Sequence, residues 1–265
     1  MSSILHTEKL VMQFGGLVAV NHLDLDVKEN CINALIGPNG SGKTTTLNMI
    51  SGALQPTDGK IIFGGKDITG LSECNTARAG IRRTFQNLKL SGRQTALQNV
   101  MLGGQGYDRS IFLDLIDPIG TNRKEKELRE KAMEKLRYIG LEQYADNMVQ
   151  DIPYGRQKLI EIARALMGDP KLLLLDEPAT GLNPVERQEL IKLLFRIKES
   201  GLTILIIEHN MDVIMHTSDW ITAISFGTKL AEGKPNDIQN DEKVISAYLG
   251  TKYKKVDLGE GSVNA

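Results

Sequence analysis

The stretch GPNGSGKT at residues 37–44 constrains the fold more than any other part of the sequence, because it fits the pattern GxxxxGK(S/T) in full. The apolar run INALI before it predicts a strand, and the run TTLNMI after it predicts a helix. At such a turn, backbone N–H groups point at phosphate oxygens, and the helix adds the positive end of its dipole. We interpret residues 37–44 as a phosphate loop rather than a glycine-rich turn with a chance lysine.

The residue types in the phosphate loop suit a nucleoside triphosphate. Glycines allow the tight turn, and Lys43 supplies a point charge to the β- and γ-phosphates. Thr44 supplies a hydroxyl to Mg²⁺. We therefore expect ATP and Mg²⁺ to bind here. The residues expected to contact the nucleotide are Gly37, Pro38, Asn39, Gly40, Ser41, Gly42, Lys43, Thr44 and Thr45.

An acidic motif, LLLLDEP at residues 172–178, completes this chemistry. Asp176 ends a predicted buried strand, where a carboxylate is costly unless a cation satisfies it, and Mg²⁺ beside Thr44 is such a cation. The side chain of Glu177 leaves the strand in another direction and can polarise an attacking water as a general base. The alternative is that both acids merely cap the next helix.

Aliphatic runs and amphipathic segments alternate in the second half of the chain. KLLLLD and LTILIIE predict buried strands, and PVERQELIKLLFRIKES between them predicts a helix, which together indicate a parallel sheet covered on both faces. Near the N-terminus, KLVMQF, LDLDV and INALI predict strands, followed by KIIF and IRRTF. The sequence therefore predicts an α/β fold.

The middle of the chain, from about residue 96 to 166, has a helical pattern. Leu128, Ala132, Leu136 and Ile139 recur at helical spacing, with charges that we interpret as a solvated face. The apolar island within residues 103–120 belongs either to the core or to a partner contact, and the polar C-terminal end predicts a mobile tail.

Composition excludes several classes of protein. A formal net charge of −1 over 265 residues argues against a disordered polyelectrolyte or a bulk polyanion binder, and we expect no nucleic-acid partner. Cys31 and Cys74 predict two buried free thiols in a reducing cytosol. The start lacks a secretory signal, and the longest apolar runs are too short to span a bilayer, so any membrane role goes through a partner.

From residue 5 to about residue 250, these motifs and four further features resemble the ATP-binding cassette (ABC) ATPases. Gln86 in RTFQN resembles the glutamine that contacts Mg²⁺ and water and links the nucleotide to a transmembrane partner. His209 in IIEHN resembles the switch histidine that bonds the γ-phosphate, and Phe14 in MQFGG resembles the aromatic that stacks on adenine. GLNP at 181–184 resembles the loop that crosses a dimer interface.

The resemblance implies a P-loop NTPase core with a mostly parallel sheet, an N-terminal antiparallel β subdomain and an α-helical subdomain. It places one ATP-binding domain over residues 1–250, with the helical subdomain at about 88–168, and leaves residues 251–265 as a mobile tail. It also implies Glu177, His209 and Gln86 as catalytic residues. The implied Mg²⁺ contacts are Thr44, Gln86 and Asp176.

Within that family, the sequence is most similar to the ATP-binding subunits of branched-chain amino-acid uptake systems, the LivG type. The similarity is carried by segments that include FGGLVAVNHLDLDV, DEPATGLNP, IIEHNMDVIM and VISAYLG. Importers of urea, amides and other amino acids share much of this pattern. At residues 90–100, Ala96 and Gln98 depart from it, near the surface expected to meet the permease.

The family signature, which begins with leucine and serine and ends with glutamine, is altered here. Pro153 and Arg156 depart from it, whereas Tyr154 and Gly155 match the branched-chain subgroup. In the family, this serine bonds the γ-phosphate held by the opposite subunit, and proline has neither hydroxyl nor N–H. Proline can still start the helix and push Ile152 to extended geometry. Arg156 either compensates in part or is solvated.

The resemblance implies an ATPase that drives an importer from the cytoplasmic face of the inner or plasma membrane, as a peripheral subunit. Its partners would be a second ABC ATPase subunit, in a hetero- or homodimer, transmembrane permease subunits and, indirectly, an extracellular or periplasmic solute-binding protein. Two alternatives stay open: a soluble ABC ATPase of translation or DNA repair, and a nucleotide-binding regulator without turnover. Pro153 predicts one impaired and one competent site, or else is a tolerated variant.

Overall fold

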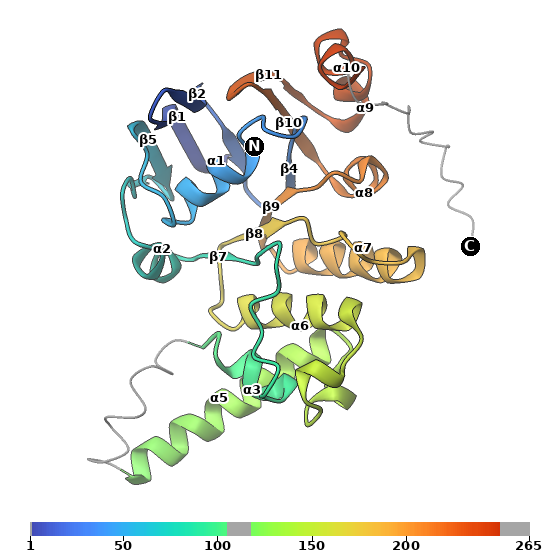
Figure 1. Ribbon diagram of the computed structural model, residues 1–265. Coiled ribbons are helices and arrows are strands. Elements are labelled where there is room, and N and C mark those ends of the chain that lie inside the picture. The colour runs from blue at the N-terminus through green and yellow to red at the C-terminus, as the bar shows by residue number, and fades with distance from the viewer. Residues whose placement is uncertain (1, 105–117, 250–265) are drawn as a thin grey trace.

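The computed structural model describes residues 2–104 and 118–249 and contains two sheets flanked by helices (Figure 1). The larger sheet has six strands in the order β11-β10-β4-β9-β8-β7. Its neighbours pair in parallel from β10 to β7, and only β11 is antiparallel. The bounds are β4 (Ile32–Ile36), β7 (Ile81–Arg83), β8 (Leu172–Asp176), β9 (Thr203–Ile207), β10 (Trp220–Ser225) and β11 (Thr228–Gly233).

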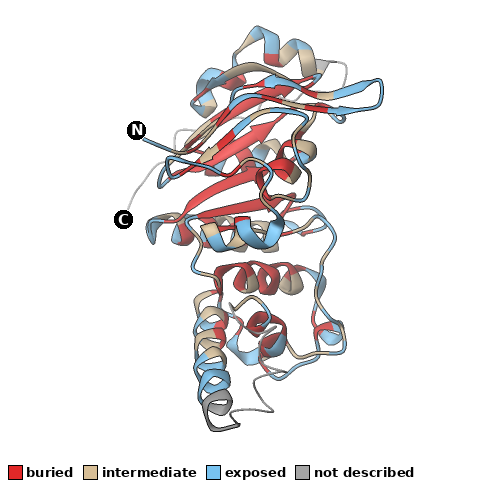
Figure 2. Cartoon of the chain, turned by 90° about the vertical axis from the view of Figure 1, so that its left-hand side faces the viewer, coloured by how far each residue is buried: buried red, intermediate tan, exposed pale blue. Residues whose placement is uncertain are grey.

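The core lies on both faces of this sheet because side chains alternate along each central strand. In β8, Leu173 and Leu175 join one apolar cluster, whereas Leu172 and Leu174 join the other. β4 and β9 alternate in the same way, and all three strands are buried along their whole length (Figure 2). This double burial explains the unbroken aliphatic runs in the sequence.

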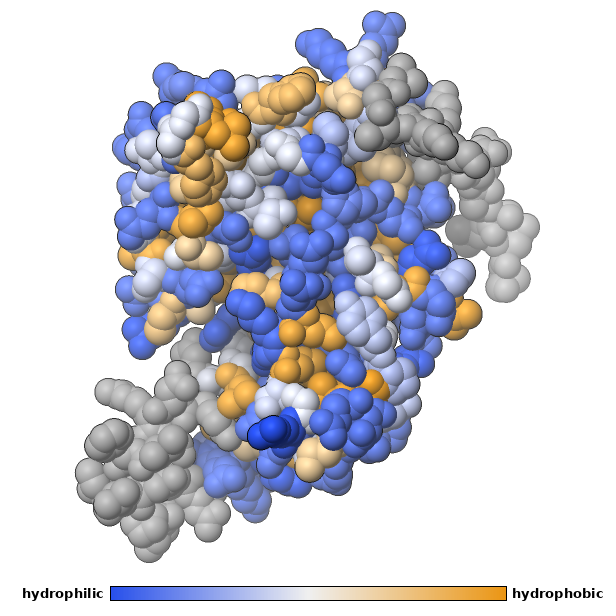
Figure 3. All heavy atoms as spheres, viewed as in Figure 1, coloured by the Kyte–Doolittle hydropathy of each residue, from blue (hydrophilic) through white to orange (hydrophobic). Residues whose placement is uncertain are grey.

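The smaller sheet is antiparallel and is formed by the N-terminal part of the chain. Its order is β2-β1-β5-β6, with β3 also paired to β1. The strands are β1 (Ser3–Phe14), β2 (Leu17–Leu23), β3 (Asp26–Lys28), β5 (Asp58–Phe63) and β6 (Lys66–Asp67). Apolar atoms gather on the surface over this sheet (Figure 3), where Phe14, Leu17 and Val18 are exposed.

The helices fall into two groups. α3, α5 and α6 lie together at one end of the molecule and pack against one another (Figure 1), and the others flank the sheets. They are α1 (Lys43–Ile50), α2 (Glu73–Ala79), α3 (Ala96–Met101), α5 (Pro118–Tyr138), α6 (Tyr154–Leu166), α7 (Pro184–Glu199), α8 (Met211–Thr217), α9 (Pro235–Gln239) and α10 (Glu242–Leu249). Among the described residues, no helix is both long and apolar enough to cross a bilayer.

Most sequence-based expectations of local structure are confirmed, and two are wrong. Ala132 and Leu136 are fully buried on α5, as their spacing predicts. LDLDV is not one strand, because β2 ends at Leu23 and β3 begins at Asp26. Cys31 is buried, but Cys74 is exposed on the first turn of α2. The expected tail at 251–265 and most of the apolar island lie outside the described residues.

Candidate active site

The phosphate loop connects β4 to α1, and its backbone leaves no room for side chains at two glycines. A Cβ on Gly37 would lie 2.2 Å from the carbonyl oxygen of Ile224. A Cβ on Gly42 would lie 2.5 Å from the carbonyl oxygen of Ala19, and Gly42 has a left-handed φ of 102°. The loop is therefore wedged between β10 and β2, and only glycine fits at these positions.

Lys43 is buried at the start of α1 and points back onto the loop. Its Nζ donates to the carbonyl oxygens of Gly37 at 2.8 Å and Pro38 at 3.0 Å. Burial lowers the pKa of Lys43, and the carboxylates of Glu177 and Asp176 oppose that shift. The ammonium thus lies within the turn of the loop, where a phosphate oxygen could replace the two carbonyl oxygens as its hydrogen-bond acceptor.

The rest of the loop is open to a ligand. Asn39, Gly40 and Thr44 are exposed, and Pro38 and Thr45 are partly exposed. The hydroxyl of Ser41 is buried and has no hydrogen-bond partner among the described residues. A buried hydroxyl without a partner is rare in folded proteins and fits a site whose ligand supplies that partner.

Asp176 ends β8 and is 3% exposed, with its two oxygens in different situations. Oδ2 lies 2.8 Å from Nη2 of Arg83, whereas Oδ1 is buried and has no partner within the described part of the chain. Within that part, no group of three His, Cys, Asp or Glu side chains is placed to hold a metal ion. A cation at Asp176 would therefore need hydroxyl, amide and phosphate oxygens, as the Thr44 and Gln86 side chains and a triphosphate offer.

Glu177 is the residue on which the sequence-predicted catalytic groups converge. Its Oε1 lies 2.5 Å from Nε2 of His209, and its Oε2 accepts a hydrogen bond from Nε2 of Gln86 at 3.0 Å. Thr180 donates its hydroxyl to Oε2 at 3.3 Å. Residues far apart in the sequence thus meet at one carboxylate beside Asp176, and we propose this carboxylate as the general base.

Phe14 is one of the exposed residues among those expected in the site. It ends β1 on the antiparallel sheet and is 46% exposed. The neighbouring strand β2 packs against α1, so this sheet borders the phosphate loop. An exposed ring at this border is available to a planar base.

The altered signature begins α6. Pro153 is the N-cap with φ −53° and ψ 142°, and Ile152 is extended with φ −92° and ψ 137°, as expected from proline. No side chain of residues 2–104 or 118–249 caps this helix start by a hydrogen bond. A Cβ on Gly155 would lie 2.3 Å from Oε1 of Glu186, so the glycine brings α6 close to α7.

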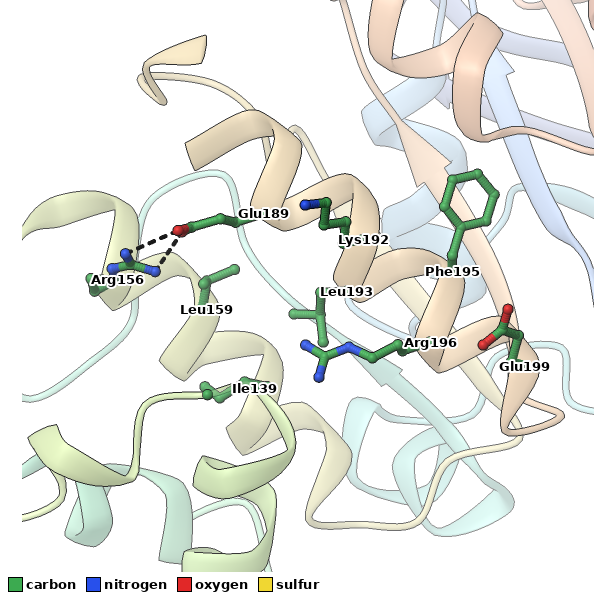
Figure 4. A pocket seen from close by; sticks show the side chains of 10 residues that line it. Ile139, Arg156, Leu159, Glu189, Lys192, Leu193, Phe195, Arg196 and Glu199 are labelled. Atoms are coloured by element: carbon green, nitrogen blue, oxygen red, sulfur yellow. Dashed lines mark hydrogen bonds and ion pairs between the residues drawn. The ribbon is translucent and has the colours of Figure 1, made fainter. Parts of the chain in front are cut away.

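Arg156 is paired with a residue of α7 while its side chain remains 31% exposed. Its guanidinium donates two hydrogen bonds to the carboxylate of Glu189, at 2.5 and 3.2 Å (Figure 4). This pair lines a groove of about 560 Å³ between the start of α6 and α7, bordered further along by Phe195 and Arg196. The contact joins the signature to the helix that follows the GLNP segment.

Sequence reasoning missed three buried charged residues of the site. Arg83 pairs with Asp176, and Lys158 donates to the main-chain carbonyl of Glu177 at 2.9 Å. Glu208 accepts N–H bonds from Ala179 at 2.5 Å and His209 at 3.1 Å. Two features of the sequence could have indicated these residues. Lys158 is a charged residue within the largely apolar helical pattern QKLIEI, and Glu208 lies directly before His209.

Comparison with known proteins decides the family. The ABC transporter family matches residues 20–180. The chain belongs to the ABC transporter ATP-binding family. As a member, this ABC cassette is an ATPase whose hydrolysis is coupled to transport. A second family, described as the branched-chain amino acid ATP-binding cassette transporter, matches residues 228–254 of the cassette.

Curated relatives match the cassette over nearly its whole length. It is 41% identical to the high-affinity branched-chain amino acid transport ATP-binding protein BraF of Pseudomonas aeruginosa, over 93% of this chain and 98% of that protein. It is 39% identical to the corresponding protein LivG of Escherichia coli, with the same coverage. These matches confirm the LivG-type resemblance.

Solved structures confirm the α/β fold. A nucleotide-free ATP-binding cassette from an ABC transporter superposes with a TM-score of 0.83 at 33% identity, covering 93% of this chain and 99% of that one. A dimeric cassette in a post-hydrolysis state with ADP and Pi superposes with a TM-score of 0.71 at 26% identity, covering 87% and 98%.

Proposed function

We propose that this cassette drives the uptake of branched-chain or closely related amino acids, as a peripheral subunit on the cytoplasmic face of the membrane. The observation that carries the proposal is the convergence of Gln86 and His209 on the carboxylate of Glu177, next to Asp176 at the end of β8. The substrate class follows from the named relatives and from the C-terminal match at 228–254.

Glu177 would act as the general base in hydrolysis. Its oxygens already accept hydrogen bonds from Gln86 and Thr180, which fixes the carboxylate in one orientation. A water near the γ-phosphate could then transfer a proton to Glu177 as it attacks. His209, whose ring lies against the same carboxylate, would turn to donate to the γ-phosphate, and Lys43 would hold the β- and γ-phosphates.

Mg²⁺ fits the residues present. Oδ1 of Asp176, which has no partner among the described residues, gives it a buried anionic ligand, and the hydroxyl of exposed Thr44 and the Gln86 amide add neutral oxygens. When bound, the ion would neutralise charge on the β- and γ-phosphate oxygens. This chain would supply the oxygens of Asp176, Thr44 and Gln86 to the ion, and the ion pair with Arg83 would orient Asp176 for that contact.

The signature of this cassette would act on the ATP held by a second cassette, as in a dimer that closes over two nucleotides. Pro153 supplies no hydroxyl, and the guanidinium of Arg156 is bonded to Glu189, so it does not replace the serine. The uncapped first turn of α6, including Gly155, would still offer N–H groups to a phosphate. These observations support one impaired site on the partner and one competent site on this chain.

The partners we propose are a second ABC ATPase subunit, transmembrane permease subunits and, through them, a solute-binding protein outside the membrane. α3, α5 and α6 would form the helical subdomain, at about residues 88–168, and the segment after Gln86 would meet the permease. The dimeric relative with ADP and Pi supports the first partner. A tandem or coiled-coil cassette of DNA repair has no support from these relatives.

Uptake by membrane vesicles tests the proposal directly. Vesicles containing this chain, a second ABC ATPase subunit and the permease subunits that co-purify with it should accumulate labelled leucine only with internal ATP. Labelled urea serves as the competing substrate. Leucine uptake that continues without this chain, or uptake of urea alone, would refute the assignment.

A further inference from the structure

We propose that Lys158 is a positioning residue that fixes the backbone of Glu177 from the signature helix. The inference rests on the proposed role of Glu177 as the general base. Lys158 lies on α6 and is 5% exposed. Its Nζ donates to the carbonyl oxygen of Glu177 at 2.9 Å, a hydrogen bond between residues that are 19 positions apart.

The backbone of Glu177 needs such a contact because its conformation is unfavourable. Glu177 has a φ of 51°, in the left-handed region that residues with a side chain rarely adopt. It also precedes Pro178, and a residue before proline prefers an extended backbone. This conformation turns the side chain out of the line of β8 and towards Gln86 and His209. The orientation of the base therefore depends on whatever holds this peptide.

Hydrogen bonds hold the peptide on both sides. The N–H of Glu177 donates to the carbonyl oxygen of Ile207 in β9 at 2.8 Å. On the other side, its carbonyl accepts from Nζ of Lys158 and from the N–H of Thr180 at 3.2 Å. The bond that Glu177 donates to Ile207 belongs to the sheet, and the bond that it accepts from Thr180 belongs to the local turn, so Lys158 is the contact that comes from α6.

Burying the charged side chain of Lys158 costs more free energy than a single hydrogen bond normally returns. Burial lowers the pKa of Lys158, and the carboxylates of Glu208, Glu161, Glu177 and Asp176 oppose that shift. Burying an ammonium is rarely favourable for stability, and apolar side chains of similar volume often serve as well. A role in orienting Glu177 gives a reason for a lysine at this position.

Lys158 also connects Glu177 to the signature. Tyr154, four residues earlier on the same face of α6, has its ring 5.6 Å from Nζ of Lys158. Tyr154 belongs to the segment expected to meet the partner's nucleotide. A shift of α6 when the dimer closes would therefore move the atom that holds the base of this chain's own site, so that closure on one nucleotide affects hydrolysis of the other.

The test compares Lys158→Met with Lys158→Arg in the assembled complex. Lys158→Met removes the donor and should lower kcat about 10- to 100-fold, because a hydrogen bond from a charged donor is lost. MgATP affinity of the isolated chain should stay within about twofold, since Lys158 is not in the phosphate loop. Hydrogen exchange at the amides of Glu177, Ala179 and Thr180 should accelerate about tenfold or more. Lys158→Arg keeps a donor and should recover most of kcat.

Lys135→Met is the matched control, because it removes a lysine of α5 that is paired with Asp169 on the surface. It should leave kcat and exchange unchanged. A wild-type kcat in Lys158→Met, combined with an inactive Glu177→Gln, would overturn the role of Lys158 but leave Glu177 as the proposed base. An equal loss of kcat, nucleotide affinity and thermal stability in both Lys158 variants would also overturn it, in favour of a purely structural role. Full activity of Glu177→Gln would instead remove the proposed base.

Discussion

Arg83 and Asp176 form a buried ion pair, with Nη2 of Arg83 2.8 Å from Oδ2 of Asp176 and both side chains less than a tenth exposed. The other terminal nitrogen of Arg83 donates to Oδ1 of Asn48 at 2.6 Å and to the hydroxyl of Ser51 at 3.1 Å. One guanidinium thus joins β7, β8 and the end of α1. It also leaves the opposite oxygen of Asp176 free for a cation.

Replacing Arg83 by methionine should destabilise the folded chain by about 3–5 kcal/mol, because breaking a buried pair leaves an uncompensated charge. Urea denaturation of the isolated chain measures the loss. Arg123→Met provides the comparison, since Arg123 forms an exposed pair with Glu127 one turn along α5. That variant should change stability by less than about 0.5 kcal/mol. Equal effects of the two substitutions would contradict the structural role of Arg83.

Gly42→Ala should abolish tight nucleotide binding. The new Cβ would meet the Ala19 carbonyl oxygen at 2.5 Å, and the left-handed φ of Gly42 adds a strain of about 1–2 kcal/mol. We expect ATP affinity measured by calorimetry to fall at least about tenfold. At Gly16 a Cβ would meet nothing within 4 Å, so Gly16→Ala should bind ATP like the wild type. Normal binding by Gly42→Ala would refute the loop geometry.

Glu177→Gln should lower ATP hydrolysis by the assembled complex about 10- to 100-fold, down to the rate of the partner's impaired site, because the site on this chain loses its general base. The amide can still accept from Gln86, so nucleotide binding should persist. Phosphate release and ATP affinity are the two measurements. Hydrolysis at the wild-type rate would mean that the working site is not on this chain.

Pro153→Ser should raise turnover at the partner's site, where the restored hydroxyl would meet the γ-phosphate. The effect is best measured in the Glu177→Gln background, in which hydrolysis comes from the partner's site alone. A hydrogen bond to a charged phosphate corresponds to about a 10- to 100-fold change in rate. Unchanged turnover would favour the alternative that Pro153 is a tolerated variant and that the two sites do not differ for this reason.

Those parts of the molecule that depend on local chemistry were predictable from the sequence. The phosphate loop and β8 follow from residue types within short windows. The extended Ile152 and the helix start at Pro153 follow from the stereochemistry of proline. In each case, the residues that determine the local structure lie within a few positions of one another, so a short stretch of sequence is enough to predict it.

The polar contacts behind the site were not predictable in this way. Arg83 and Asp176 are 93 positions apart, and nothing in the segment around Arg83 indicates that it pairs with Asp176. The left-handed backbone of Glu177 is set by β9 on one side and α6 on the other, so no window around it contains the reason. The partner of Arg156 was not predictable either, because Glu189 is one of several acids on α7 and nothing in the sequence distinguishes it from the others.

The antiparallel sheet and the phosphate loop treat the two ends of a nucleotide very differently. In the proposed site, buried ammonium, hydroxyl and carboxylate groups would surround the phosphates, whereas the base would meet Phe14, a ring that is nearly half exposed. An aromatic face stacks on any purine and reads none of its edge atoms. This protein should therefore distinguish a triphosphate from a diphosphate far more sharply than adenine from guanine, and in the cell it would take ATP largely because ATP is the abundant purine triphosphate.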